Sequence, residues 1–265
     1  MKKSDIRVAI VRMEGTNCEQ ELQDAFTVLG VDSKFVHIKQ LKELTGFHCV
    51  VIPGGFSAGD YVRAGAIFAS LIKTKIFKEL KEFIKEGYPV LGICNGFQIL
   101  VEMGFLPGKG RGRACLAPND SGVYECRPTL VRNENRGKCV FTNKLKRKEI
   151  RMMPCAHAEG KIILEEPKKM LSQLKADDQI VFRWVDPDGK LAGYPWNPNG
   201  SLDNLAGLCN MEGNVLGLMP HPERSFFRWQ HVDWVRKGLS APGGYNVGDG
   251  RAIFESVIEC ISKKF

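Results

Sequence analysis

The stretch of sequence at residues 88–104 reads YPVLGICNGFQILVEMG. An apolar run from Pro89 to Ile93 predicts a buried strand, and apolar residues at helical spacing beyond it predict a helix that ends near Gly104. Cys94 lies at the corner between the two elements. A strand that turns sharply into a helix, with a nucleophile at the corner, is the geometry of a nucleophile elbow. The sequence therefore makes Cys94 a candidate nucleophile.

Two glycines flank this candidate, at Gly92 and Gly96. A corner residue in a strained backbone conformation leaves no room for neighbouring side chains, which explains glycine at both positions. The corner also places the thiol near the first free N–H groups of the following helix. Their partial positive charge favours a thiolate.

The chain before this stretch alternates between predicted strands and helices. The strands are expected at 6–12, 34–38 and 48–55. One helix is expected to carry Leu22, Ala25, Phe26 and Leu29 on one face, with Thr16 or Asn17 as its cap and Gly30 at its end, and another is expected at about 74–86. Such alternation predicts a mostly parallel sheet flanked by helices. In sheets of this kind the site lies beyond the carboxyl ends of the strands. Both Cys94 and the loop PGGFSAGDYVRAGA (53–66) are expected there.

The second half of the chain has a different texture, with short strand-like segments between turn signals. The segments are 123–131, 150–157, 179–185, 191–196, 204–210 and 215–221, and a helix is expected within 248–265. No flexible linker interrupts them, so we expect an antiparallel or mixed β extension of a single α/β domain covering residues 1–265. The piece 226–248 is interpreted as a surface excursion whose two tryptophans pack on the body or on a partner.

The composition of the 265 residues is ordinary for a globular protein, with 43% hydrophobic and 26% charged residues. No apolar run approaches the roughly 20 residues of a membrane helix, and the N-terminus has no signal-peptide pattern. We therefore expect a cytoplasmic protein without a membrane partner. The nine cysteines show no zinc-ligand spacing, which predicts reduced thiols and no metal site.

The net charge of +8 comes from dispersed basic residues. The densest basic run, KLKRKEIR (144–151), contains no aromatic residue. This pattern favours a solvated basic face that suits an acidic partner over a nucleic-acid site.

A cysteine nucleophile needs a base and a group that orients the base. The segment MPHPERS (219–225) offers His221 and Glu223. Pro222 biases His221 toward extended backbone, in which side chains two residues apart point to the same side. The carboxylate can then fix the imidazole tautomer and leave the other ring nitrogen for the thiol. Alone, this pair is weak evidence, because a histidine at a strand end is more often structural.

These residues together resemble a known family. GICNGFQ followed by PHPE resembles the class I, or triad, glutamine amidotransferases. The segments PGGFSAGDYVRAGA, NDSG, AHAEG, NPNGSLDNLAG and NVLGLMPHPER look more specifically like the branch formed by glutaminase subunits of phosphoribosylformylglycinamidine synthases, in purine biosynthesis. The resemblance runs from about residue 7 to 225 and over the terminal helix. It implies a class I glutamine amidotransferase fold.

The resemblance also implies roles for individual residues. Cys94 would attack the side-chain amide of L-glutamine, release ammonia and form a glutamyl thioester that water hydrolyses. His221 would act as general acid and base, and Glu223 would orient it. Backbone N–H groups of Gly55 and Asn95 would form the oxyanion hole, consistent with a helix start and a glycine loop at neighbouring strand ends.

A glutamine-binding set follows from the same resemblance: Gln98, Asn119, Ser121, Gly122 and His157. Gln98 lies four residues after Cys94 and hence on the same helix face. Two of these assignments have simpler alternatives. Residues 119–122 can be only a turn, and His157 only a structural histidine.

The family resemblance implies partners but no cofactor in this chain. Ammonia would pass to a synthetase subunit that binds ATP, magnesium and formylglycinamide ribonucleotide, with a small acidic bridging subunit as a third component. We expect the synthetase to cover the loop 53–66.

The segment GKGRG (108–112) lacks the context of a phosphate-binding loop. Ala58, where relatives usually carry Tyr, and Ala158, where they carry Gly, depart from the family pattern.

Two other functions fit parts of the pattern. One is a stand-alone thiol hydrolase on the same scaffold, which the PHPE pair disfavours. The other is a non-catalytic regulatory or binding subunit, which the intact trio of Cys94, His221 and Glu223 disfavours. The activity of the isolated chain compared with that of an assembled complex would separate the three.

Overall fold

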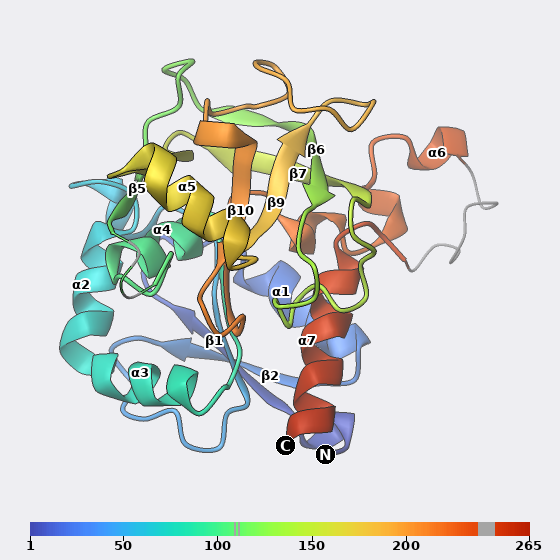
Figure 1. Cartoon of the computed structure of the whole chain (residues 1–265). Helices are drawn as coiled ribbons and strands as arrows, with labels where there is room; N and C mark the ends of the chain where they lie inside the picture. The colour runs from blue at the N-terminus through green and yellow to red at the C-terminus, as the bar shows by residue number, and fades with distance from the viewer. Residues whose placement is uncertain (109, 111, 238–246) are drawn as a thin grey trace.

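A mixed β-sheet runs through the molecule, and helices cover both faces of its parallel part (Figure 1). The computed structural model describes residues 1–108, 110, 112–237 and 247–265. Within these residues, nine strands form the sheet in the order β2-β1-β3-β4-β11-β10-β9-β6-β7. The fold class expected from the sequence is confirmed.

The parallel part of the sheet carries the predicted strand–helix alternation. Its strands are β1 (Arg7–Arg12), β2 (Asp32–His37), β3 (Cys49–Ile52), β4 (Val90–Ile93) and β11 (Val215–Leu218). Each pairs in parallel with its neighbours within this part. Three of these strands, β3, β4 and β11, are buried along their whole length, as expected for a sheet covered on both faces.

Helices flank these strands in two groups (Figure 1). On one side lie α2 (Ala66–Lys75), α3 (Phe77–Lys85) and α4 (Asn95–Glu102), and on the other α1 (Glu19–Val28) and α7 (Arg251–Lys264). The rings of Phe26 and Phe254 meet edge to face at 5.5 Å and join α1 to α7. The chain's last helix therefore packs against its first.

The second half extends the same sheet with antiparallel strands, as expected. They are β10 (Leu205–Cys209), β9 (Ile180–Val185), β6 (Glu125–Asn133) and β7 (Ile150–His157). A separate antiparallel pair is formed by β5 (Ala114–Ala117) and β8 (Lys161–Leu164). Helix α5 (Pro167–Ala176) follows β8. Short 3₁₀ turns complete this list: η1 (Lys3–Asp5), η2 (Ser57–Asp60), η3 (Leu202–Asn204), η4 (Pro222–Ser225) and η5 (Arg228–Gln230).

Several local predictions were wrong. The segment 191–196 is not a strand, and Leu191 and Tyr194 are exposed without a strand partner. Helix α1 begins after Cys18, whose side chain makes no capping hydrogen bond, so neither Thr16 nor Asn17 is its N-cap. The helix expected at 74–86 is α3 alone. Five helices and strands of the described residues were not predicted at all, namely α2, α5, α6, β5 and β8.

The excursion predicted at 226–248 is only partly described. Its first part forms η5 and α6 (Trp234–Lys237), and residues 238–246 lie outside the described residues. Trp229 stacks on Phe227 at 5.4 Å, although 53% of its surface stays exposed. Because Phe227 belongs to the same segment, this contact does not test whether the tryptophans pack on the body or on a partner, which stays a prediction. Positions 109 and 111 of the segment GKGRG also lie outside the described residues.

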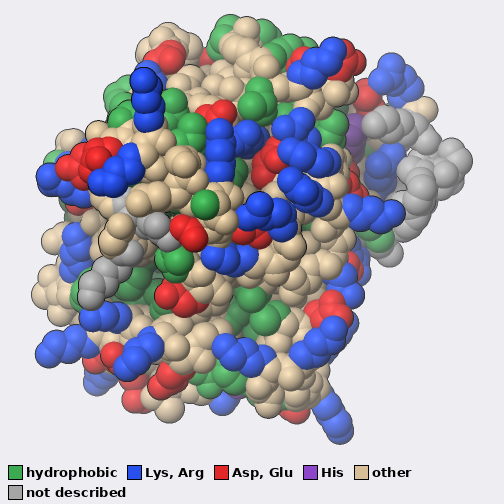
Figure 2. Space-filling model, viewed as in Figure 1, with side chains coloured by type: hydrophobic (Ala, Val, Ile, Leu, Met, Phe, Trp, Pro, Cys, Tyr) green, Lys and Arg blue, Asp and Glu red, His purple; other side chains and the backbone are tan. Residues whose placement is uncertain are grey.

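The basic residues are distributed as expected. Figure 2 shows Lys and Arg side chains interspersed with acidic ones over the face in view. Within the densest basic run, Lys144 pairs with Glu259 at 2.6 Å and Lys148 pairs with Glu134. This run is therefore partly neutralised rather than presented as a free basic patch. In the described part of the chain, no helix combines the length and apolar character needed to cross a membrane.

Candidate active site

Cys94 occupies the sharp corner between β4 and α4. Its φ of 50° and ψ of −104° are unusual for a residue with a side chain, and this strained backbone is typical of a nucleophile elbow. The flanking glycines are required by space. A Cβ on Gly96 would lie 2.0 Å from the carbonyl oxygen of Ile52, and one on Gly92 would lie 2.5 Å from that of Gly96. Close backbone contact therefore holds the corner in shape.

The sheet brings His221 to the same place. β11 pairs in parallel with β4, with Leu218 opposite Ile93, so both strands end at the same edge of the sheet. The backbone N–H of Cys94 donates to the carbonyl of Leu218 at 2.8 Å. Three residues beyond Leu218, the N–H of His221 donates to the carbonyl of Pro154 in β7 at 2.8 Å. Neighbouring parallel strands thus juxtapose two residues 127 positions apart in the sequence, at 94 and 221.

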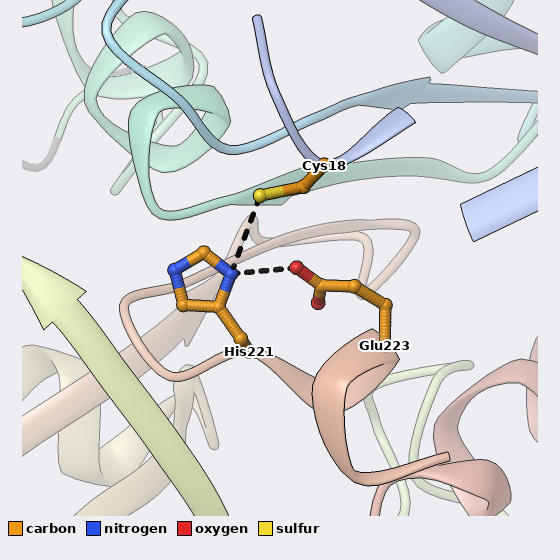
Figure 3. Close-up of side chains that lie close together, drawn as sticks. All are labelled: Cys18, His221 and Glu223. Carbon is orange, nitrogen blue, oxygen red and sulfur yellow. Dashed lines mark hydrogen bonds and ion pairs between the residues drawn. The ribbon is translucent and has the colours of Figure 1, made fainter. Parts of the chain in front are cut away.

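His221 and Glu223 form a buried pair (Figure 3). Nδ1 of His221 lies 2.6 Å from Oε1 of Glu223, and each residue is 1% exposed. The predicted pairing is present, but its backbone explanation was only half right. His221 is extended, whereas Glu223 lies in the 3₁₀ turn η4. The turn, not a continuing strand, points the carboxylate back at the ring.

This pairing leaves the other nitrogen of the imidazole, Nε2, buried without a hydrogen-bond partner in the described residues. With Nδ1–H donated to the carboxylate, Nε2 is free to accept a proton. Burial, the largest influence, lowers the pKa of His221, but the negative charges of Glu223 and then of Cys94 outweigh it. The pKa of His221 is raised well above its usual range. The ring is therefore suited to hold a proton taken from a thiol.

A second cysteine lies behind the imidazole. Sγ of Cys18 is 3.9 Å from Nδ1 of His221, and Arg224 donates an N–H to this sulfur at 3.1 Å. Burial raises the pKa of the Cys18 thiol. The atoms of Cys18, His221 and Glu223 that could bind a metal ion lie within 4.8 Å of one another. Among the described residues this is the one group of three or more side chains with such an arrangement. The guanidinium of Arg224 already fills one approach to it, which disfavours a metal cation.

The loop after β3 passes beside Cys94. A Cβ on Gly54 would lie 2.7 Å from Cε1 of His221 and 3.4 Å from Cβ of Cys94. Neither Gly55 nor Asn95 has a backbone acceptor for its N–H among the described residues. Both predicted oxyanion donors are thus unpaired, one next to Gly54 and one next to Cys94.

A chain of buried hydrogen bonds ties this loop to α4. The hydroxyl of Ser57 donates to Oδ1 of Asn95 at 2.6 Å, and Nδ2 of Asn95 donates to Oε1 of Gln98 at 2.9 Å. Nε2 of Gln98 donates in turn to the carbonyl of Glu159 at 2.5 Å. The amide of Gln98 is therefore engaged within the protein, where it fixes the loop that carries Gly55.

A cavity of about 550 Å³ opens over these groups. Cys94, His221, Gln98 and His157 line it, together with residues that the sequence interpretation did not single out. These additional lining residues include Cys18, Asp60, Tyr124, Glu159 and Arg224. Both the candidate nucleophile and the candidate base therefore line one space of a size suited to a small substrate.

The rest of the predicted glutamine-binding set is distributed differently. Asn119, Ser121 and Gly122 are not among the cavity's lining residues. The side-chain amide of Asn119 donates to the carbonyls of Val123 and His157, at 3.0 and 2.8 Å, and its oxygen accepts the N–H of Gly160 at 3.1 Å. This amide braces the segment that carries His157.

His157 lines the cavity but is 3% exposed. Burial lowers its pKa to about 4, so the ring is neutral at pH 7. Of the two departures from the family pattern, Ala158 lines the cavity and Ala58 adopts a left-handed φ of 53° in η2. Neither displaces Cys94 or His221 from the cavity.

The residues that sequence reasoning missed share one property: they act through contacts between distant segments. Ser57 and Asn95 are 38 positions apart, and Cys18 and His221 are 203 apart. The clearest sequence signal for two of these residues was that each follows the end of a strand. Asp60 lies in the loop after a buried strand, and Glu159 lies two residues after the end of β7.

Comparisons with known proteins agree with this geometry. A family model described as a CobB/CobQ-like glutamine amidotransferase domain matches residues 5–259. A curated protein from Archaeoglobus fulgidus, phosphoribosylformylglycinamidine synthase subunit PurQ, is 49% identical over 99% of this chain and 100% of its own length. The protein of the same name from Methanothrix thermoacetophila is 42% identical over 98% of this chain and 99% of its own.

A solved structure is also similar. A chain in the structure of PurLQS from Thermotoga maritima superposes with a TM-score of 0.74 at 30% sequence identity. The match covers 97% of this chain and 99% of that one. The likeness therefore extends over almost the whole fold, including the antiparallel extension.

Proposed function

Because this chain belongs to the CobB/CobQ-like glutamine amidotransferase family, we propose that Cys94 is the catalytic nucleophile of the chain. Within that family the chain belongs to the glutaminase subunits of phosphoribosylformylglycinamidine synthase. The proposed reaction is the hydrolysis of L-glutamine to glutamate and ammonia. One observation carries the proposal: Cys94, strained at its elbow, lines the same cavity as His221, whose ring is paired with the buried Glu223.

The first half of the reaction forms a thioester. Nε2 of His221 takes the thiol proton of Cys94, and the sulfur attacks the amide carbon of glutamine. The unpaired N–H groups of Gly55 and Asn95 stabilise the negative charge that develops on the amide oxygen. His221 then gives its proton to the departing nitrogen, the carbon–nitrogen bond breaks, and ammonia leaves.

The second half releases glutamate. Water gives a proton to Nε2 of His221 and attacks the thioester carbon, and the carbon–sulfur bond breaks with return of the proton to Cys94. Throughout, Glu223 holds Nδ1–H and stabilises the charged ring, as the 2.6 Å contact allows. This sequence needs no cofactor, and we propose that the chain carries none and that the site holds no metal.

The ammonia serves a ligase in this family, and we propose that it passes to a synthetase subunit that converts formylglycinamide ribonucleotide with ATP and magnesium. Exposed apolar residues around the cavity support a docked partner. Phe56 and Tyr124 line the cavity with 55% and 61% of their surfaces exposed, and the adjoining Tyr61 and Val62 are 89% and 71% exposed. Such a patch beside a site marks a protein interface.

Three further proposals complete this assignment. A small bridging subunit joins the complex, and the net charge of +8 suits an acidic one. Residues 1–265 form one domain, which the pairing of β4 with β11 supports because it joins the two halves of the chain. The location is cytoplasmic, which suits nine free cysteines that include the nucleophile.

The alternatives are weaker. A non-catalytic subunit would have no need for a strained cysteine facing a buried His–Glu pair. A stand-alone thiol hydrolase would not be expected to carry an exposed apolar rim around its substrate cavity. The relatives named above are subunits of a synthase.

The test is glutamine hydrolysis by wild-type and Cys94→Ala protein, each alone and mixed with the synthetase and its substrates. We expect glutamate release that depends on Cys94 and rises in the assembled complex, with a loss of at least about 10³-fold in Cys94→Ala. Activity that survives in Cys94→Ala, or wild-type protein that stays inert in the complex, would refute the proposed function.

A further inference from the structure

The cavity carries two carboxylates that the proposed catalytic steps do not use. Asp60 and Glu159, here called the acidic wall, both line it. They come from segments 99 positions apart, the loop after β3 and the turn after β7. One oxygen of Asp60, Oδ1, is buried without a hydrogen-bond partner in the part of the chain that the structure describes. Neither carboxylate forms an ion pair with Lys or Arg among those residues.

The structure holds these carboxylates in place through backbone groups. Glu159 accepts the N–H of Ala64 at 3.0 Å, and the N–H of Gly65 donates to the carboxyl group of Asp60. Asp60 itself has a left-handed φ of 52°, which a residue with a side chain adopts at a cost. Backbone N–H groups of one loop, at residues 64 and 65, therefore hold both carboxylates of the acidic wall.

Electrostatics makes this arrangement unfavourable in the empty cavity. Burial first, and then the nearby charge of Glu159, raises the pKa of Asp60 to about 6. A positively charged group placed between the two carboxylates would reverse both effects. The cavity has a second, independent mark of a ligand site: His221 lines it, 1% exposed, with Nε2 unpartnered.

The backbone at Glu159 is tied to the helix that follows Cys94. The carbonyl of Glu159 accepts from Gln98, which lies four residues beyond Cys94 on α4. That spacing is one helical turn, about 5.4 Å.

We propose that Asp60 and Glu159 bind the α-ammonium group of the substrate, so that the acidic wall selects an α-amino acid amide over an amide that lacks the amino group. This inference rests on the proposed function of the cavity. The unpaired Oδ1 of Asp60 accepts one ammonium N–H, and Glu159 accepts a second. The bound ammonium also fixes the loop that carries Gly55, because Glu159 is linked to that loop through Gln98, Asn95 and Ser57.

The kinetic test compares L-glutamine with glutaramate, the same amide without the α-amino group, in the assembled complex. Asp60→Asn and Glu159→Gln keep shape and remove charge. We expect each to raise KM for L-glutamine about 10- to 100-fold, with a smaller change in kcat and little change for glutaramate. Glu79→Gln, an exposed carboxylate on α3, is the control and should match wild type.

The specificity ratio is the deciding quantity, since a merely structural change would lower turnover of both amides together. If both variants keep the wild-type preference for L-glutamine over glutaramate, the acidic wall does not bind the ammonium group.

A binding measurement separates this inference from the proposed function. Calorimetric titration of L-glutamine into complexes carrying Cys94→Ala, with and without Asp60→Asn, needs no turnover. We expect affinity to fall about 10- to 100-fold with Asp60→Asn and to stay unchanged for glutaramate. This result would support the acidic wall even if Cys94 proved not to be the nucleophile. Equal affinities, or no binding of L-glutamine, would overturn it.

Discussion

The cavity has two sides that are built in different ways. The catalytic side, formed by Cys94, His221 and Glu223, is fixed by the main chain: two neighbouring parallel strands end at one edge, and each is followed by a tight turn. The rest of the lining, here called the opposite side, includes Asp60 and Glu159 and depends on single hydrogen bonds between side chains and backbone groups. The catalytic side is therefore a property of the fold, whereas the opposite side is a property of particular side chains.

This difference predicts how substitutions act. A change on the catalytic side should stop the chemistry and leave the structure in place, because strands and turns still position the remaining groups. A change on the opposite side should shift binding, loop position or stability by smaller amounts. The predictions that follow test this comparison, in order of decreasing effect on turnover.

The largest effect in this series is expected for Glu223→Gln. Without the carboxylate, the tautomer of His221 is no longer fixed and its pKa falls, because the charge of Glu223 is the main influence that raises it. We expect kcat for glutamine hydrolysis to fall about 10²- to 10⁴-fold with KM within a few-fold of wild type. Turnover close to that of the exposed control Glu79→Gln would show that the pair is only structural.

The same division explains what the sequence could predict. The elbow around Cys94 is encoded in seven consecutive residues, GICNGFQ, and the His–Glu pair in PHPE, so both were predicted from local patterns. The parallel half of the fold followed from strand–helix alternation in the same way. Glycines at positions 92 and 96 were a reliable sign, since a Cβ at either place would collide with backbone.

Long-range contacts were not predictable from one sequence. The bond from Gln98 to the carbonyl of Glu159 joins residues 61 positions apart, and no local spacing signals it. Local reasoning also failed where a loop motif ran into a helix. After the glycine-rich loop, which was expected as far as residue 66, the next helix was expected only at about 74, whereas α2 begins at Ala66 and buries Phe68, Ala69 and Ile72. Tertiary packing outweighed the loop signal there.

A smaller effect is expected for Ser57→Ala. The hydroxyl of Ser57, 2% exposed, donates to Asn95 and holds the loop that presents the N–H of Gly55. Loss of this buried hydrogen bond costs roughly 1 to 2 kcal/mol. If that energy positions the oxyanion donor, kcat falls about tenfold while KM for L-glutamine changes little.

The matched control is Ser70→Ala, at an exposed position of α2. Steady-state kinetics of both variants, with their thermal unfolding midpoints, separates positioning from stability. A Ser57→Ala enzyme as active as Ser70→Ala would mean that the loop keeps its position without the hydrogen bond, and the two sides of the cavity would then be more alike than we infer.

The smallest effect on turnover at pH 7 is expected for His157→Gln, whose main consequence should be for stability in acid. Burial, the first cause, depresses the pKa of His157 from 6.5 to about 4. A depressed histidine contributes stability above the unfolded pKa, and this contribution is lost as the pH falls toward the folded pKa, because the unfolded chain binds the proton first. Between pH 7 and 5 the wild type should lose about 2 kcal/mol of unfolding free energy through this group.

Urea denaturation at both pH values should show a smaller loss for His157→Gln than for wild type or for His37→Gln, a partly exposed control in β2. Equal acid sensitivity in all three proteins would contradict a neutral, structural His157, and a large rise in KM for L-glutamine would instead return this residue to the glutamine-binding set.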